Sequence, residues 1–199
     1  MSIQNAKSDK ISTMHCSTNG VTPVNSYALV AYTPNPLKQF LDGLRRELVS
    51  TCRIQSHLTV LPPRPLASVE DAWNQLQRQL QDVPAFDVEL GEIEVFPVTS
   101  VVYLSVCRGR QMIEQIHNEL NVDHLAYDEP YPYHPHVTLA QSLQPHEVDR
   151  VVELAKRRWA EFQNSHTFCV ETLTFVQNTV QDCWMDLAEC HLTPAPILR

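Results

Sequence analysis

Two stretches of the chain show the same alternation of polar and apolar positions. In His57-Leu58-Thr59-Val60 and in His136-Val137-Thr138-Leu139, a histidine and a threonine alternate with apolar residues. Successive side chains of a strand point to opposite faces, so each pattern predicts a strand with an apolar back. The other face would then present an imidazole beside a hydroxyl. A single His-x-Thr triplet is a weak motif, and the second copy makes the pattern informative.

A helical pattern follows each stretch at the same distance. Apolar positions begin to recur with the helical period twelve residues after His57, at Val69, and twelve residues after His136, at Val148. The two stripes have the same offsets and comprise Val69, Ala72, Trp73, Leu76, Leu80 and Val83, then Val148, Val151, Val152, Ala155, Trp159 and Phe162. The repeated order predicts an internal duplication in which each half supplies one His-x-Thr strand and one packing helix.

Local signals mark where these helices begin. Ser68 with Asp71 fits a capping box, and Pro145 fits the first turn of the later helix. Trp73 and Trp159 hold equivalent positions in the two stripes, so we expect both in the core.

The other periodic segments complete the predicted order, which is β-α-β-α-β twice with one closing strand. Strands are expected at 26–32, 53–61, 86–96, 101–106, 135–141, 168–175 and 183–190, and further helices at 37–48 and 112–120. Pro62 and Pro63 are expected to end the first motif strand, and Gly91 marks a bulge or turn. The fold class is therefore α+β with two sheets.

The pattern also predicts how the chain is divided. Residues 1–22 lack periodicity and are interpreted as a loose extension, and residues 192–199 as a tail. Between them, residues 23–191 form a single bilobal domain with repeat halves at about 23–97 and 98–191. A third triplet, His191-Leu192-Thr193, precedes a proline-rich end and is assigned to the tail.

The composition and charge of the chain limit the classes of binding partner to expect. The chain has 199 residues and a net charge of −8, which argues against an extended surface for nucleic acid. Six cysteines without a C-x-x-C pair favour a reduced, cytoplasmic protein, and no apolar run is long enough for a membrane span. We expect a monomer that binds a small nucleotide or the end of an RNA.

Two His-x-Thr pairs that face one cleft can perform acid/base chemistry. With a reference pKa near 6.5, one imidazole can be neutral and act as a base while the other is charged and acts as an acid. The hydroxyls of Thr59 and Thr138 can donate hydrogen bonds to phosphate oxygens. This chemistry requires no metal and no cofactor.

The paired motifs resemble the two-histidine phosphoesterase superfamily, which includes the 2′-5′ RNA ligase-like proteins and the cyclic phosphodiesterases. The stretch 135–140 is the closest local match, and the likeness spans about residues 24–190. The resemblance implies two mostly antiparallel sheets that face each other across a cleft, with helices outside. It also implies His57 and His136 as the catalytic pair and Thr59 and Thr138 as phosphate contacts, without a metal.

The resemblance implies substrates with 2′,3′-cyclic phosphates, 2′-5′ linkages or cyclic ADP-ribose phosphates. We expect a metal-independent phosphodiesterase that acts on a 2′,3′-cyclic phosphate, and cleavage or ligation of 2′-5′ linkages is compatible with the motifs. Many relatives have a basic residue where this chain has Gln141, and the sequence after the first motif also departs from theirs. A non-catalytic module that binds RNA ends or nucleotides is therefore the alternative. A metal site built from His134, His136 and another histidine is a second alternative.

Three further residues near the motifs are candidate substrate contacts. His134 precedes the second histidine by two residues, and a role in the loop is its alternative. Tyr133, like Tyr131, could stack on a base or pack beside the prolines. Arg64 could steer phosphate or be an exposed arginine without a partner.

Overall fold

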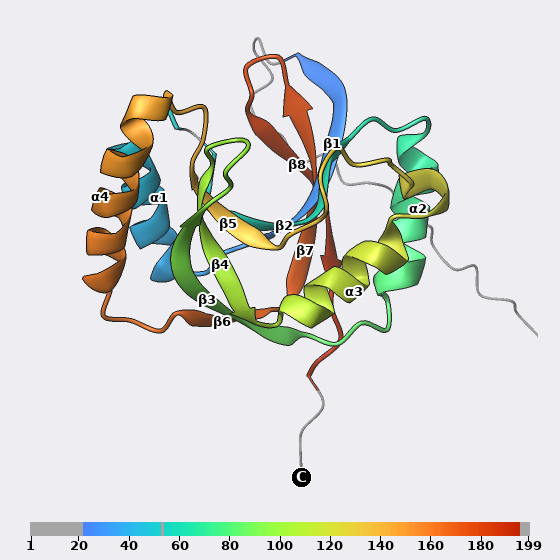
Figure 1. The fold of residues 1–199 in the computed structure, drawn as a ribbon. Helices are drawn as coiled ribbons and strands as arrows, with labels where there is room; N and C mark the ends of the chain where they lie inside the picture. The colour runs from blue at the N-terminus through green and yellow to red at the C-terminus, as the bar shows by residue number, and fades with distance from the viewer. Residues whose placement is uncertain (1–21, 53, 196–199) are drawn as a thin grey trace, which may run out of the picture.

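The structure, a computed structural model, describes residues 22–52 and 54–195 of the chain. In this part of the chain, two four-stranded antiparallel sheets are flanked by α-helices (Figure 1). The α+β class and the two antiparallel sheets predicted from the sequence are confirmed. None of the helices in these two ranges is long and apolar enough to span a membrane.

The elements follow the predicted order up to β5 and α4. The strands are β1 (Pro23–Tyr32), β2 (His57–Arg64), β3 (Phe86–Val95), β4 (Val102–Arg108), β5 (His136–Ala140), β6 (Thr167–Val170), β7 (Thr172–Thr179) and β8 (Trp184–His191). The helices are α1 (Leu37–Leu48), α2 (Val69–Leu80), α3 (Arg110–Leu120) and α4 (Val148–Ala160), with short 3₁₀ turns η1 (Asp123–Leu125) and η2 (Pro145–Glu147).

The two motif strands occupy equivalent places. The first sheet has the strand order β2-β1-β7-β8 and the second has the order β5-β4-β3-β6. Each motif strand therefore lies at the edge of its sheet, beside the first strand of its repeat. The strands β2 and β5 contact each other where the sheets meet (Figure 1).

The two repeat halves exchange strands between the two sheets. β3 belongs to the first half of the sequence, but it pairs with β4 and β6 in the second sheet. β7 and β8 come from the second half and complete the first sheet by pairing with β1. Each sheet thus contains strands from both halves of the sequence.

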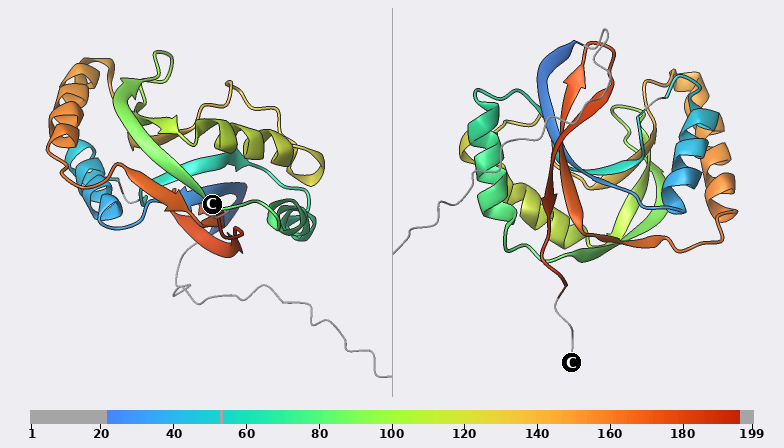
Figure 2. Two further views of the ribbon diagram at one scale, coloured as in Figure 1. Left: turned by 90° about the horizontal axis from the view of Figure 1, so that it is seen from below. Right: turned by 180° about the vertical axis from the view of Figure 1, so that it is seen from behind.

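The helices interlock in the same way. α1 connects β1 to β2 but packs on β5 and beside α4, whereas α3 connects β4 to β5 but packs on β2 and beside α2. Figures 1 and 2 show these pairs along opposite flanks of the sheets. The predicted apolar stripes face the core, where Trp73 and Trp159 are both buried. The backbone N–H of Asp71 donates to the Ser68 side chain, which confirms the predicted cap of α2.

The predicted strand at 168–175 is two strands in different sheets. Phe168 and Val170 are buried on β6, and Leu173 and Phe175 are buried on β7, so the alternation changes phase at Glu171. β6 pairs with β3 of the second sheet, and β7 pairs with β1 of the first. The change of phase marks the point where the chain passes between the sheets.

Other predicted boundaries also move. β2 continues through Pro62 and Pro63 to Arg64, because an edge strand tolerates residues without an N–H on its open side. Its predicted start at residue 53 lies outside the described residues, as does the extension apart from residue 22. Residues of the predicted tail are part of the fold, because the Thr193 N–H donates to Val83 O and Ala85 N–H donates to Thr193 O. The predicted irregularity at Gly91 is confirmed by the broken register there.

Candidate active site

The two motif strands present their polar residues as the alternation predicts. His57 and Thr59 on β2, and His136 and Thr138 on β5, are half-buried. The four apolar residues on the backs of these strands are almost inaccessible, namely Leu58, Val60, Val137 and Leu139. The apolar backs fix which face each strand turns outward, so both reactive pairs face away from the core.

A cleft of about 740 Å³ brings the two pairs together. Its lining includes both histidines and both threonines, and it extends to the loops around Phe96–Thr99 and Glu129–His134. A cleft of this size suits a small molecule or the end of a chain. The structure therefore gathers the four predicted residues from two distant parts of the sequence at one site.

The same hydrogen bond orients each histidine. Nδ1 of His57 lies 2.7 Å from the carbonyl oxygen of Gln55, and Nδ1 of His136 lies 2.7 Å from that of His134. A carbonyl oxygen only accepts, so Nδ1 is the protonated nitrogen of each neutral ring. Nε2 is then the nitrogen available for proton transfer. The sequence pattern gave no indication of this hydrogen bond.

The surroundings of the two imidazoles differ. Burial lowers the pKa of His57 to about 4, and the positive charges of Arg45 and His136 act in the same direction. Burial also lowers the pKa of His136, and the charge of His134 acts in the same direction. His57 is therefore neutral at neutral pH, and the charge of Arg45 acts on this histidine.

Arg45 is a residue of the cleft that the sequence analysis missed. It comes from α1, is 5% exposed and lines the cleft. Its Nη1 donates to the carbonyl oxygen of Thr138, and its Nη2 lies 3.5 Å from the sulfur of Cys52. Among the described residues its Nε has no hydrogen-bond partner. The sequence signal was a charged residue within the apolar stripe of α1, next to Leu44.

Aromatic rings surround the second histidine. Phe96 and Tyr103 stack with their centroids 4.1 Å apart, and both contact the ring of His136 edge-on. His134 contacts the same two rings and lines the cleft. Desolvation lowers the pKa of His134, and the Arg110 charge adds to this effect. His134 therefore lies at the cleft wall, next to the second motif.

Tyr133 packs within the protein and connects the two motifs. Its ring stacks on His117 with centroids 3.7 Å apart, and its hydroxyl donates to the carbonyl oxygen of Thr59 at 2.7 Å. Burial raises the pKa of Tyr133 above its ordinary value. With its ring covered by His117, Tyr133 braces the first motif strand, whereas Tyr131 is 56% exposed at the cleft.

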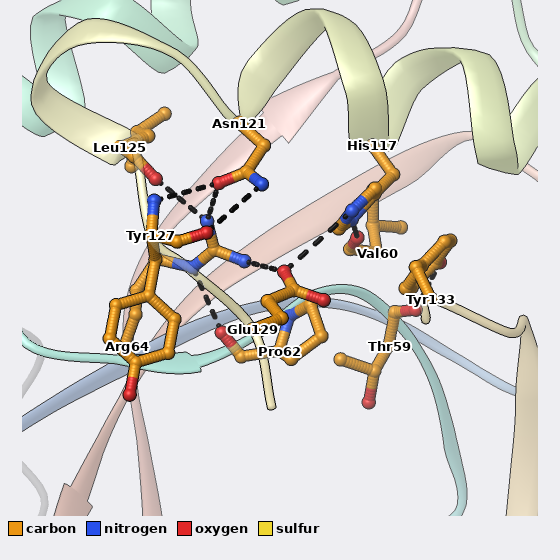
Figure 3. Close-up of polar contacts among 10 residues, drawn as sticks. All are labelled: Thr59, Val60, Pro62, Arg64, His117, Asn121, Leu125, Tyr127, Glu129 and Tyr133. Carbon is orange, nitrogen blue, oxygen red and sulfur yellow. Dashed lines mark hydrogen bonds and ion pairs between the residues drawn. The ribbon is translucent and has the colours of Figure 1, made fainter. Parts of the chain in front are cut away.

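Arg64 is neither the phosphate contact nor the exposed, unpaired arginine that the sequence analysis considered. Its side chain is 1% exposed and forms an ion pair of 2.6 Å with Glu129. It also donates to Asn121 Oδ1 and to the carbonyl oxygens of Leu125 and Pro62 (Figure 3). Arg64 therefore neither is exposed nor faces the cleft. Through these contacts Arg64 connects the end of β2 to the segment before β5.

The described residues contain no group of three or more His, Cys, Asp or Glu side chains placed to hold a metal ion. In the same part of the chain, five cysteines are free. The lining of the cleft includes the imidazoles of His57, His134 and His136, the hydroxyls of Thr59 and Thr138, and the guanidinium of Arg45.

Sequence comparison finds relatives over most of the chain. The family model described as the 2′-5′ RNA ligase superfamily matches residues 33–182. A protein of Geobacillus kaustophilus with the provisional name of a phosphoesterase is 21% identical over 149 residues, which cover 70% of this chain and 82% of the relative. A protein of Staphylococcus epidermidis with the same provisional name is 23% identical over 160 residues, or 75% of this chain and 90% of the relative.

Solved structures share the fold. The crystal structure of E. coli LigT complexed with phosphate has a TM-score of 0.58 and 16% identity, covering 86% of this chain and 99% of LigT. The crystal structure of TT0787 of Thermus thermophilus has a TM-score of 0.60 and 17% identity, covering 85% of this chain and 98% of that protein. The arrangement of two interlocked sheets is thus common to these proteins.

Proposed function

The chain belongs to the 2′-5′ RNA ligase superfamily, and from this premise we propose that it is a phosphodiesterase that hydrolyses a 2′,3′-cyclic phosphate. The substrate would be a small nucleotide or the end of an RNA. The observation that carries the proposal is the presence of two His-x-Thr pairs on one cleft, each histidine held through Nδ1 by the carbonyl oxygen two residues before it.

The asymmetry of the two imidazoles suggests their roles. His57 is neutral at neutral pH, so its Nε2 takes a proton from the attacking water. The new P–O bond forms as the bond from phosphorus to one ribose oxygen breaks. His136, in its protonated form, gives its proton to that departing oxygen. One proton is taken and one is delivered, so each turnover adds one water and leaves a phosphomonoester.

Three groups are placed to stabilise negative charge on the phosphate. The hydroxyls of Thr59 and Thr138 line the cleft beside the histidines and can donate hydrogen bonds to non-bridging oxygens. Arg45 adds a positive charge at the cleft floor, where low solvent access strengthens its field. LigT, which has the same fold, has been crystallised with phosphate.

Charge and size favour a small or terminal substrate. The net charge of −8 disfavours long stretches of nucleic acid, because binding them depends on many Lys and Arg contacts. The cleft of about 740 Å³ lies within the range of small-molecule sites.

A substrate panel tests the proposal. It contains the four nucleoside 2′,3′-cyclic phosphates, an RNA ending in a cyclic phosphate, 2′-5′ dinucleotides and cyclic ADP-ribose phosphate. We expect turnover of the cyclic phosphates, measured as appearance of the phosphomonoester by chromatography. Binding of these compounds without turnover would instead favour the non-catalytic module, and turnover of the 2′-5′ dinucleotides alone would change the substrate class.

A further inference from the structure

A second, smaller hollow adjoins the first histidine. Its volume is about 110 Å³, and it shares His57 and Thr59 with the large cleft. Trp184 also lines both cavities. The hollow therefore lies directly beside the place where the proposed phosphate would lie.

Small apolar side chains form the floor of this hollow. Ala28 and Val30 on β1 and Val176 on β7 make a buried cluster that is separate from the main core. They lie on the same face of the first sheet as the motif, because Val30 pairs directly with Thr59 in the antiparallel register. The hollow exists because the position beside Thr59 carries a side chain as small as valine.

The second sheet fills the equivalent position. There Tyr103 pairs with Thr138 in the same register that joins Val30 to Thr59. The Tyr103 ring stacks on Phe96, and its hydroxyl donates to Glu94 at 2.9 Å. The two sides of the cleft thus differ in shape, and the room for a bulky substituent lies on the His57 side.

Two aromatic residues line the hollow. Tyr32 pairs with His57, and its hydroxyl donates to Asp186 at 2.5 Å, which fixes the position of its ring. Trp184 on β8 is half-buried and packs against the small cluster. Aromatic walls above an apolar floor suit a flat ring, and stacking on aromatic side chains is a common way for proteins to hold nucleobases.

The size of the hollow indicates how large that ring can be. A protein cavity of about 150 Å³ holds one benzene molecule. A hollow of about 110 Å³ that opens into the cleft can therefore take one six-membered ring more easily than two fused rings.

We propose that this hollow binds the nucleobase of the substrate, with a preference for the single ring of a pyrimidine, while the phosphate lies between His57 and His136. This inference rests on the proposed function for the position of the phosphate. The ribose places base and cyclic phosphate on one small ring, which suits a base site that shares His57 and Thr59 with the cleft.

The test fills the hollow and compares substrates with and without a base. Ala28→Leu adds three carbons to the floor, and Ala160→Leu, on an exposed position of α4, is the matched control. The substrates are 2′,3′-cyclic UMP, 2′,3′-cyclic AMP and glycerol 1,2-cyclic phosphate, which has no base. We expect the wild type to prefer cyclic UMP to cyclic AMP. Ala28→Leu should lower kcat/KM for cyclic UMP roughly tenfold or more, and that for the glycerol compound less than about twofold.

A second variant covers a failure of Ala28→Leu to fold. Trp184→Ala removes a wall of the hollow, and it should raise KM for cyclic UMP while sparing the glycerol compound. Equal losses on both substrates, or no loss on either, in a folded Ala28→Leu or Trp184→Ala variant would overturn the base site. The base would then lie elsewhere in the cleft, for example near the exposed Tyr131.

A binding measurement separates this inference from the proposed activity. Trp73 and Trp159 are buried in the core, so Trp184 is the tryptophan whose fluorescence a bound base would change. Titration with 3′-UMP should quench the wild type, and Trp184→Phe should abolish the signal. Quenching that Ala28→Leu weakens would support the base site even if no cyclic phosphate were hydrolysed. Equal quenching by ribose 5-phosphate and 3′-UMP would contradict it.

Discussion

The two sides of the cleft carry the same reactive groups on differently built walls. Both present His-x-Thr on an edge strand, and both hold Nδ1 of the histidine with the carbonyl oxygen two residues before it. The neighbours of these strands differ, because Val30 lies beside Thr59 whereas Tyr103 lies beside Thr138. Both copies of the motif therefore share the orientation of the histidine, and the neighbouring strands determine how much space lies beside each threonine.

The electrostatic surroundings of the two sides differ as well. His57 lies near the charges of Arg45 and His136, which lower its pKa together with burial. His136 lies instead among Phe96, Tyr103 and His134. The two histidines make the same hydrogen bond through Nδ1, but their neighbours differ, and this difference can give the two side chains different pKa values. An acid and a base can thus be made from one repeated motif.

The largest expected effect on turnover comes from removing either histidine. His57→Ala and His136→Ala should each lower turnover of a cyclic phosphate by roughly 10²–10⁴, the usual contribution of a general acid or base. The double variant should be little slower than either single variant, because the two residues act as a unit. Steady-state kinetics would measure the loss, with circular dichroism as the check on folding. A folded single variant with near-wild-type turnover would remove that residue from the mechanism.

The next effect is on stability, and it concerns Arg64, which connects the end of β2 to the segment before β5. Arg64→Met should lower the free energy of unfolding by roughly 3–5 kcal/mol, because it leaves the buried Glu129 without its arginine and with only the more distant Nε2 of His117, at 3.7 Å. Arg108→Met is the control, since the ion pair of Arg108 with Asp87 is exposed and should contribute about 0–1 kcal/mol. Urea unfolding measures both. An exposed ion pair contributes about 0–1 kcal/mol. If Arg64→Met lost no more than that, the buried contacts of Arg64 would not stabilise the connection between β2 and the segment before β5.

A smaller effect would come from making the surroundings of the histidines more alike. Arg45→Met removes a positive charge near His57, so the pKa of His57 should rise toward its ordinary value. The loss in kcat/KM should be roughly tenfold, equal to about 1.4 kcal/mol of charge stabilisation. Titration of the histidine ring protons by NMR would follow the pKa. The neighbouring Arg46→Met, at an exposed position, should leave both quantities unchanged.

The smallest effect is expected from chelation. If the two imidazoles perform the reaction, exhaustive treatment with a chelator should change turnover less than about twofold. Metal analysis of the purified protein should find less than one zinc per chain. Activity that is lost on chelation and restored by zinc would favour the alternative in which His134 and His136 are metal ligands.

The residues that determine local structure could be recognised from the sequence. The alternation at His57–Val60 and the stripe that begins at Val69 each depend on neighbours within a few turns or pleats, so period and capping predicted them. The sequence also marks the point near Glu171 where the chain passes from one sheet to the other, because the alternation of apolar residues changes phase between Val170 and Leu173. Only two polar residues, Glu171 and Thr172, separate the two alternating segments, so the two short strands had the pattern of one.

The rest depends on contacts between distant parts of the chain. Arg64 is buried because Asn121, Leu125 and Glu129, about sixty residues later, supply its acceptors. Arg45 reaches the cleft because α1 packs against the sheet of the other motif. The helical period marks Arg45 as a charged residue within the apolar stripe of α1, but it does not encode what this face packs against. No local pattern encodes the acceptors of Arg64.

The central claim is that His57 is the base and His136 the acid, and the pH dependence of kcat/KM tests it most directly. This quantity reports the groups of the free enzyme. Activity should fall at low pH as His57 becomes protonated, near its pKa of about 4. It should also fall as His136 loses its proton, below its ordinary value of 6.5, since burial lowers that pKa. The optimum should therefore lie between about 4 and 6.5, with folding checked at each pH.

Residual activity of the two single variants assigns the limbs of this profile. His136→Ala should lose the high-pH limb and keep the low-pH one, and His57→Ala should do the reverse. A flat profile for the wild type, an optimum above about pH 7, or the opposite assignment of the limbs would contradict the account.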